Sequence, residues 1–150
     1  SKFYERRVIM RKLQVFMLTV LLITLVFTFN SSAEIGVELR CNMKEPTDLE
    51  EKMIDKIVEN IKEEENLYYT EEKEQKLMVL LSALDEGEGA IFYGISFVMK
   101  FPGDGALYHV HSFAGFDQAE RVEKSAALIV NEIYPRYKNW HQQLNEELSE

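Results

Sequence analysis

Residues 90–113 constrain the fold of this chain more than any other stretch. The segment "AIFYGISFVMKF" alternates large apolar side chains with smaller or polar ones, and "ALYHVHSF" follows it after the turn sequence "PGDG". A period of two is typical of a strand with one buried face, and closely spaced Pro and Gly residues are typical of a tight turn. The stretch therefore predicts a β-hairpin. The expected partners across it are Met99 with Tyr108, Phe97 with Val110, and Ile95 with Ser112.

The remaining patterns predict one more strand and four helices. Residues 34–42 alternate as in a half-buried strand, and Thr47 with Glu50 forms a capping-box pattern ahead of an amphipathic segment. Later leucines recur at helical spacing, and glycines follow them. Pro135 is expected to separate the last two helices. The expected helices cover residues 46–66, 66–89, 117–134 and 135–150.

The resulting order, β-α-α-β-β-α-α, predicts an α+β fold. We expect a small antiparallel sheet of about three strands covered by amphipathic helices. The length of 150 residues fits one domain, which we place at residues 34–150.

The first 33 residues have the pattern of an export segment. Five basic residues precede Val15–Phe29, a run of fifteen residues without a charge, and small residues follow up to Ala33. A basic start, an apolar run and a small-residue exit make up a secretory signal peptide, with cleavage expected after Ala33. Residues 1–33 are therefore expected to be a signal peptide or a membrane anchor.

The anchor alternative uses residues 13–29, whose seventeen residues reach the lower edge of the spanning range. A third interpretation, a buried core helix, leaves the flanking charges unexplained. In the first two, the basic residues stay inside and Glu34 onward lies outside the cytoplasm. The protein is thus expected to be periplasmic or secreted, or anchored by a single span with its C-terminal domain outside.

Charge narrows the range of partners. The chain has a formal net charge of −9, and residues 34–150 hold 12 basic against 25 acidic residues, a net charge of −13. Such an acidic surface repels phosphate backbones and anionic lipids. No nucleic-acid partner is therefore expected. Membrane contact is expected only through residues 13–29, if they stay uncleaved. A basic protein partner is electrostatically favoured.

The sequence offers little for catalysis. Cys41 is the only cysteine, so no internal disulfide forms, and its place in an alternating strand predicts a buried apolar residue. The chain contains no GxSxG, HExxH, P-loop or CxxC motif. These observations argue against an enzyme without deciding the matter, and no cofactor is expected.

His109 and His111 are the most conspicuous polar pair in the hairpin. Residues two apart on a strand share a face, with Cα atoms about 7 Å apart, so both imidazoles are expected on one side. The same side is unusually apolar for a solvated face. Either the C-terminal segment with Tyr137, Trp140 and Leu144 covers it, or it is a binding surface. The expected partner-binding residues are Phe92, Ser96, Val98, Leu107, His109, His111 and Phe113.

These observations predict a small exported acidic protein that binds another protein at the cell envelope or outside the cell. An inhibitor, an immunity-type protein and a subunit of an envelope complex all fit. One alternative is a metal-binding protein or metal-dependent enzyme that uses His109 and His111. Another is a carrier of a small apolar ligand. Its pocket would be lined by Phe92, Phe97, Phe101 and Trp140.

Overall fold

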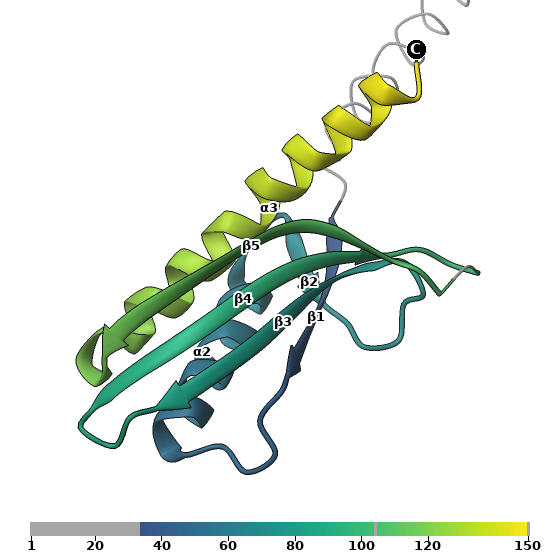
Figure 1. The fold of residues 1–150 in the computed structure, drawn as a ribbon. Helices are drawn as coiled ribbons and strands as arrows, with labels where there is room; N and C mark the ends of the chain where they lie inside the picture. Colours follow the sequence, from purple (N-terminus) through teal and green to yellow (C-terminus); the bar gives the residue numbers. More distant parts are fainter. Residues whose placement is uncertain (1–33, 104, 150) are drawn as a thin grey trace, which may run out of the picture. The chain divides into compact units, whose positions relative to one another are not determined.

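The predicted hairpin exists within a larger sheet. A computed structural model describes residues 34–103 and 105–149 of the chain. The fold is α+β, with a five-stranded mixed sheet and two α-helices (Figure 1). The elements are β1 (Ile35–Cys41), α2 (Asp48–Glu63), β2 (Leu67–Tyr69), β3 (Lys76–Asp85), β4 (Ala90–Lys100), β5 (Leu107–Gln118), the 3₁₀-helix η1 (Ala119–Arg121) and α3 (Val122–Glu147).

The strands lie in the order β2-β1-β3-β4-β5. β1 runs parallel to β2 and β3, while the pairs β3–β4 and β4–β5 are antiparallel. The connection between the parallel neighbours β1 and β2 contains α2, since parallel strands cannot be joined by a tight turn. The α+β class is confirmed, whereas the expected antiparallel sheet of about three strands is too small and wrong in part of its strand directions.

The helix expected over residues 66–89 is wrong, because this stretch forms β2, a loop and β3. β3 lies in the middle of the sheet, and its first four residues are buried on both faces. A strand buried in this way has no polar alternation to reveal it. Its leucines at 77, 80, 81 and 84 also satisfy helical spacing, and spacing alone does not separate a short apolar run in a strand from one in a helix.

At the helix ends, one prediction is confirmed and two are wrong. The Thr47 capping box is confirmed: its side chain accepts from the Glu50 N–H, and Glu50 accepts from the Thr47 N–H. The two C-terminal helices are one, because α3 continues through Pro135. Proline removes one intrahelical hydrogen bond, but α3 packs against the core on both sides of it, through Ile133 and Tyr137. α3 also begins at Val122 rather than at residue 117.

Both helices lie on one face of the sheet, and α3 extends past the end of the sheet (Figure 1). A single core fills the space between the helices and this face. Its largest fully buried side chains include Met53, Ile57 and Ile61 from α2, Ile129 and Ile133 from α3, and Val37, Leu77, Val79, Leu81, Ile91, Ile95 and Phe97 from the sheet.

In the described part of the chain, no helix covers the opposite face of the sheet. The alternative in which the C-terminal segment with Tyr137, Trp140 and Leu144 covers that face is wrong, because Tyr137 and Trp140 pack against the core on the helix side. The Trp140 ring lies 6.2 Å from that of Phe101, which belongs to the same side.

The β4–β5 register is correct at its start and then shifts. Met99 lies opposite Tyr108 as expected, and Gly103 and Gly105 in the connecting turn adopt φ values of 92° and 67°. A β-bulge then leaves Val110 without a partner, because Val98 pairs with His109 and Phe97 with His111. Every pair beyond the bulge is displaced by one residue.

The expected export segment, residues 1–33 with cleavage after Ala33, lies outside the described residues. Within residues 34–103 and 105–149, no helix combines the length and the apolar character needed to cross a membrane.

Candidate functional site

The uncovered face of the sheet, which we call the open face, is hollowed where small side chains lie side by side. Two neighbouring cross-strand rows form its floor: Leu80–Ser96–Ser112 and Ser82–Gly94–Ala114. A hollow of about 650 Å³ lies over these rows, and Arg40, Cys41 and Asn42 line its β1 end. Five of the six floor residues have small side chains, so the surface is recessed there relative to the larger side chains around it.

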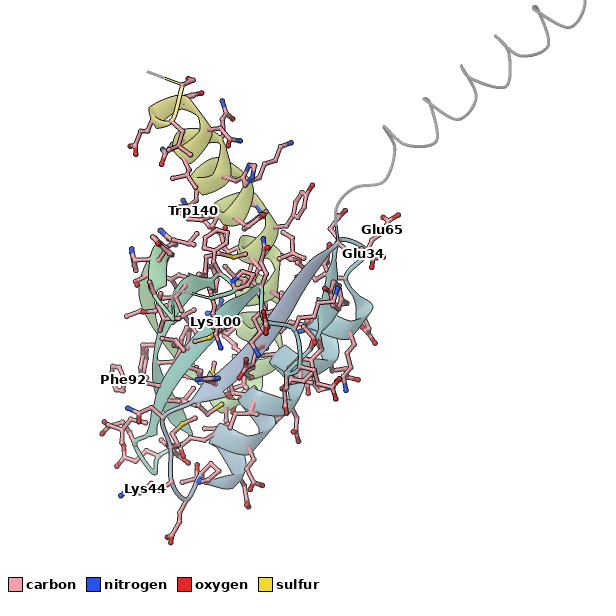
Figure 2. The ribbon with its side chains drawn as sticks, turned by 90° about the vertical axis from the view of Figure 1, so that its right-hand side faces the viewer. Glu34, Lys44, Glu65, Phe92, Lys100 and Trp140 are labelled. Carbon is pink, nitrogen blue, oxygen red and sulfur yellow. The ribbon has the colours of Figure 1, made fainter. Side chains whose placement is uncertain are left out.

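The next row along the strands is large and apolar. Leu84, Phe92 and Phe116 form this row, which we call the apolar ridge. They are 59%, 47% and 54% exposed, and the two phenyl rings lie 4.6 Å apart. Figure 2 shows Phe92 projecting from the sheet on the side away from α2. A contiguous exposed apolar row beside a hollow is typical of a binding surface.

A short chain of hydrogen bonds crosses the floor of the hollow. The Ser96 and Ser112 hydroxyl oxygens lie 2.8 Å apart, and Ser112 Oγ lies 2.8 Å from His109 Nε2. A histidine beside a serine is the connectivity of a base and a nucleophile. Within residues 34–103 and 105–149, no carboxylate hydrogen-bonds to His109, so this pair lacks the third member that a catalytic triad has.

A buried ion pair joins β1 to β3, and it is linked to the hollow through Arg40. Glu38 contacts Lys76, and Arg40 Nε lies 2.6 Å from Glu38 Oε1. Lys76 also donates to the Glu71 carbonyl at 2.5 Å, which ties the loop after β2 to this end of the face. Burial opposes ionisation of Glu38, but hydrogen bonds and charges of Lys76 and Arg40 outweigh it and hold the pKa of Glu38 below its ordinary value of 4.5.

Charge is distributed unevenly between the sheet and the helices. The 33 residues of β3, β4 and β5 hold only four charged side chains, two of each sign. These are Lys76, Asp85, Lys100 and Asp117. The 16 residues of α2 hold six acids against three lysines. Most acidic residues of the chain therefore lie outside the three strands that form the hollow and the apolar ridge.

The structure brings five of the seven predicted binding residues to the open face. Ser96 lies in the floor and Phe92 in the apolar ridge. His109 and Leu107 lie in the rows on the other side of the floor, and neither lines the hollow. Val98 shares the row of His109 but is buried, so it is not part of the exposed surface.

The other two predicted residues were assigned to the wrong face. The bulge at Val110 turns the rings of His111 and Phe113 toward the helices, where both lie within 6.5 Å of the buried Phe97 ring. Phe113 nevertheless contributes to the lining of the hollow. A single extra residue reverses the alternation of every side chain after it.

The metal hypothesis loses its geometric basis for the same reason. His109 hydrogen-bonds to Ser112 on the open face, while the His111 ring lies near Phe113 on the helix side. The pair therefore does not converge on one ion. Within residues 34–103 and 105–149, no group of three or more His, Cys, Asp or Glu side chains is placed to hold a metal.

Several residues of the site were missed from the sequence. They are Leu80, Ser82, Leu84, Gly94, Ser112, Ala114 and Phe116. Leu84 was assigned to a helix, and the unshifted register put Ser112 on the helix side. A usable signal was present in the small residues Gly94 and Ser96, two apart on one strand face. Cys41, expected to be buried, is exposed at the end of the hollow, and partial desolvation raises the pKa of its thiol.

Comparisons with known proteins add little to this geometry. No protein-family model matches the chain, and no curated protein matches its sequence. Among solved structures, the chain is similar to the hypothetical protein CT253 from Chlamydia trachomatis. The identity is 6%, the match covers 56% of this chain and 72% of that chain, and the TM-score is 0.36. A likeness of this degree carries no argument about function.

Proposed function

We propose that this chain is an exported binding protein that receives a protein partner on its open face, at the cell envelope or outside the cell. The observation that carries the proposal is the apolar ridge beside the hollow, on the face that no described helix covers. Folding by itself favours a polar surface on such a face. The basic start and uncharged run of residues 1–33 support export.

The geometry favours a partner that inserts an apolar side chain into the hollow and packs against Phe92 and Phe116. The hollow and the apolar ridge contain few charged side chains. The acidic surface around them would therefore attract a basic partner and raise the association rate, but would add little to the affinity of the complex. An inhibitor, an immunity-type protein or a subunit of an envelope complex would all bind in this way.

The two alternatives have less support. The metal hypothesis needed His109 and His111 on one face, and they lie on opposite faces. The small-ligand hypothesis needed four aromatic rings around one pocket. Phe97 is instead buried in the core, Phe92 lies on the open face, and the Phe101 ring lies 6.2 Å from that of Trp140 on α3.

Site-specific photocrosslinking in the native host tests the open face. A photoreactive phenylalanine analogue at position 92 should give an adduct of one defined mass. A matched probe at Leu128, 56% exposed on α3, should not give that adduct. Adding Gly94→Leu to the first probe fills the hollow and should abolish the adduct. The same adduct from both probes, or one that survives Gly94→Leu, would contradict the proposal.

The mass of the protein recovered from its host tests the export step separately. A chain that begins at Glu34 supports a cleaved signal peptide, and a membrane-bound chain that retains residues 13–29 supports the anchor. A soluble cytoplasmic chain with these residues intact would rule out both.

A further inference from the structure

The strand directions bring several distant segments to one end of the sheet. β1 and β3 are parallel and β4 is antiparallel to β3, so the starts of β1, β3 and β5 and the end of β4 lie at the same end. The Trp140 ring on α3 lies 6.2 Å from the ring of Phe101, which follows β4, so the C-terminal half of α3 reaches this end too. In Figure 2, Glu34 and Trp140 both lie toward the end opposite Lys44.

Aromatic side chains gather at this end of the domain. The Phe101 ring lies 5.5 Å from that of Tyr108, and the Tyr137 ring lies 6.2 Å from that of Trp140. We call these four residues and their neighbour Leu107 the aromatic end. Tyr108 is 44% exposed and Leu107 is 52% exposed. Large apolar side chains are therefore presented to the surroundings here, away from the open face's hollow.

α3 carries the same apolar stripe past the end of the sheet (Figure 1). Leu144 and Leu148 follow Trp140 by four and eight residues, so all three lie along one side of the helix. Leu144 is only half-buried and Leu148 is 78% exposed. The stripe thus continues beyond the core that explains its first part.

The charge around the aromatic end differs from that of the rest of the domain. Residues 135–145 contain Arg136 and Lys138 and no acid, although residues 34–150 carry a net charge of −13. Lys100 ends β4 at the same place. Trp and Tyr flanked by Lys and Arg are typical of protein segments at the interface between a membrane and water. Repulsion from a lipid surface is also weakest where acids are absent.

The chain that precedes the domain joins it at this same end. Four residues, 30–33, separate Glu34 from the uncharged run that ends at Phe29. Even fully extended, the chain from Phe29 to Glu34 spans at most about 18 Å. A bilayer crossed by the uncharged run therefore lies within reach of the aromatic end and beyond reach of the opposite end of the sheet.

We propose that residues 13–29 are retained as a membrane span and that the aromatic end of the domain rests on the outer surface of the same bilayer. The inference rests on the anchored form of the proposed function and adds a lipid contact made by the domain itself. Trp140 and Tyr108 would lie at the level of the lipid headgroups. The strands would lead away from the bilayer, so that the apolar ridge, at their other end, stays accessible to a protein partner.

Trp140 is the only tryptophan of the chain and reports this contact directly. The full chain is reconstituted in phosphatidylcholine vesicles, with and without bromine atoms on the acyl chains, because bromine quenches tryptophan only at close range. Trp140 should be less fluorescent in the brominated vesicles. Equal fluorescence in the two lipids overturns the proposal, and it is also the result expected if another protein or a second copy covers the aromatic end instead.

Charged substitutions on the exposed stripe should release the domain from the lipid. Leu144→Glu combined with Leu148→Glu should remove most of the quenching, and Leu107→Glu on the hairpin is an independent second variant. Leu128→Glu is the matched control, since Leu128 is 56% exposed on α3 but lies about 18 Å before Trp140 along the helix. Quenching that persists in both test variants, or that Leu128→Glu relieves equally, also overturns the proposal.

The outcomes separate this inference from the proposed function. A chain recovered from its host with Glu34 as its first residue overturns the membrane contact, while crosslinking at position 92 still decides whether the open face binds a protein. Quenched Trp140 without an adduct at position 92 supports the lipid contact and contradicts the protein partner.

Discussion

Two phenylalanines on β4 show how differently the two faces of the sheet are used. Phe97 is fully buried under the helices, whereas Phe92, five residues earlier, is 47% exposed beside Phe116. A buried aromatic side chain removes about 150–250 Å² from water, which is among the largest single contributions to a core. The side chains on the helix-covered face therefore stabilise the fold. The open face exposes apolar side chains that the stability of the fold does not require.

Two glycines on neighbouring strands repeat the contrast. Gly115 faces the helices, and a Cβ there would overlap the Tyr93 ring. Gly94 faces the hollow, and a Cβ there would have no atom within 4 Å. The first glycine is needed for packing. The second leaves space that the fold does not fill, which is what a binding site requires.

Alanine substitutions at these two phenylalanines should give the largest difference in stability between the two faces. Phe97→Ala should lower the free energy of unfolding by about 3–5 kcal/mol, because it leaves a cavity in the core. Phe92→Ala should lower it by less than about 1 kcal/mol, because the ring is half in solvent. Urea unfolding of the full chain measures both changes. Equal losses would mean that the open face is covered in solution and would remove the contrast.

The ion pair at Glu38 tests whether the open face contributes to stability near β1. Glu38→Gln should cost about 3 kcal/mol, since it leaves the buried Lys76 charge without its partner. Because the folded-state pKa of Glu38 is depressed, its stabilisation is present above its ordinary value of 4.5 and is lost as the pH falls through the lowered value.

The free energy of unfolding should therefore decrease more steeply below pH 4.5 in the wild type than in Glu38→Gln. Asp55→Asn, which removes an exposed acid of α2, is the matched control and should keep the wild-type slope. Identical slopes in all three proteins would mean that Glu38 is not ion-paired in solution.

The parts of the fold that sequence predicts well are those where one face is polar. α2 shows a clear helical period and the hairpin a clear alternation, so both elements were predicted in the right place. β5, however, runs to Gln118, past the predicted end at Phe113, and its register shifts at the bulge. β3 was not, because its buried half carries apolar side chains on both faces and no period remains. The predicted break at Pro135 was wrong, because packing of α3 on both sides of the proline outweighs one lost hydrogen bond.

The site depended on a feature that sequence does not encode in any simple way. Phe92, Ser96 and His109 were placed correctly because they precede the bulge or lie on the unbulged strand. His111 and Phe113 were misplaced because the bulge at Val110 leaves no compositional trace: no glycine stands there. The rows that make the hollow are visible only after three strands are aligned in register.

Gly115→Ala should have the next largest effect on stability. The added methyl group meets the Tyr93 ring between β5 and the helices, and overpacking a core typically costs about 1–3 kcal/mol. Thermal unfolding measures the loss. The double variant with Tyr93→Leu should recover part of it, because the smaller side chain makes room. A neutral Gly115→Ala would mean that Tyr93 turns away at little cost.

Gly94→Val should have the smallest effect and the opposite sign. Valine is favoured in strands and glycine weakens them, so the substitution should raise the free energy of unfolding by about 0.5 kcal/mol. The side chain enters open space above the floor of the hollow, so no clash offsets this gain. The same variant should lose the adduct formed by a photoreactive probe at Phe92. Greater stability with lost binding would show that the glycine keeps the hollow open at the expense of the strand. A destabilised Gly94→Val would mean instead that the hollow is filled in solution.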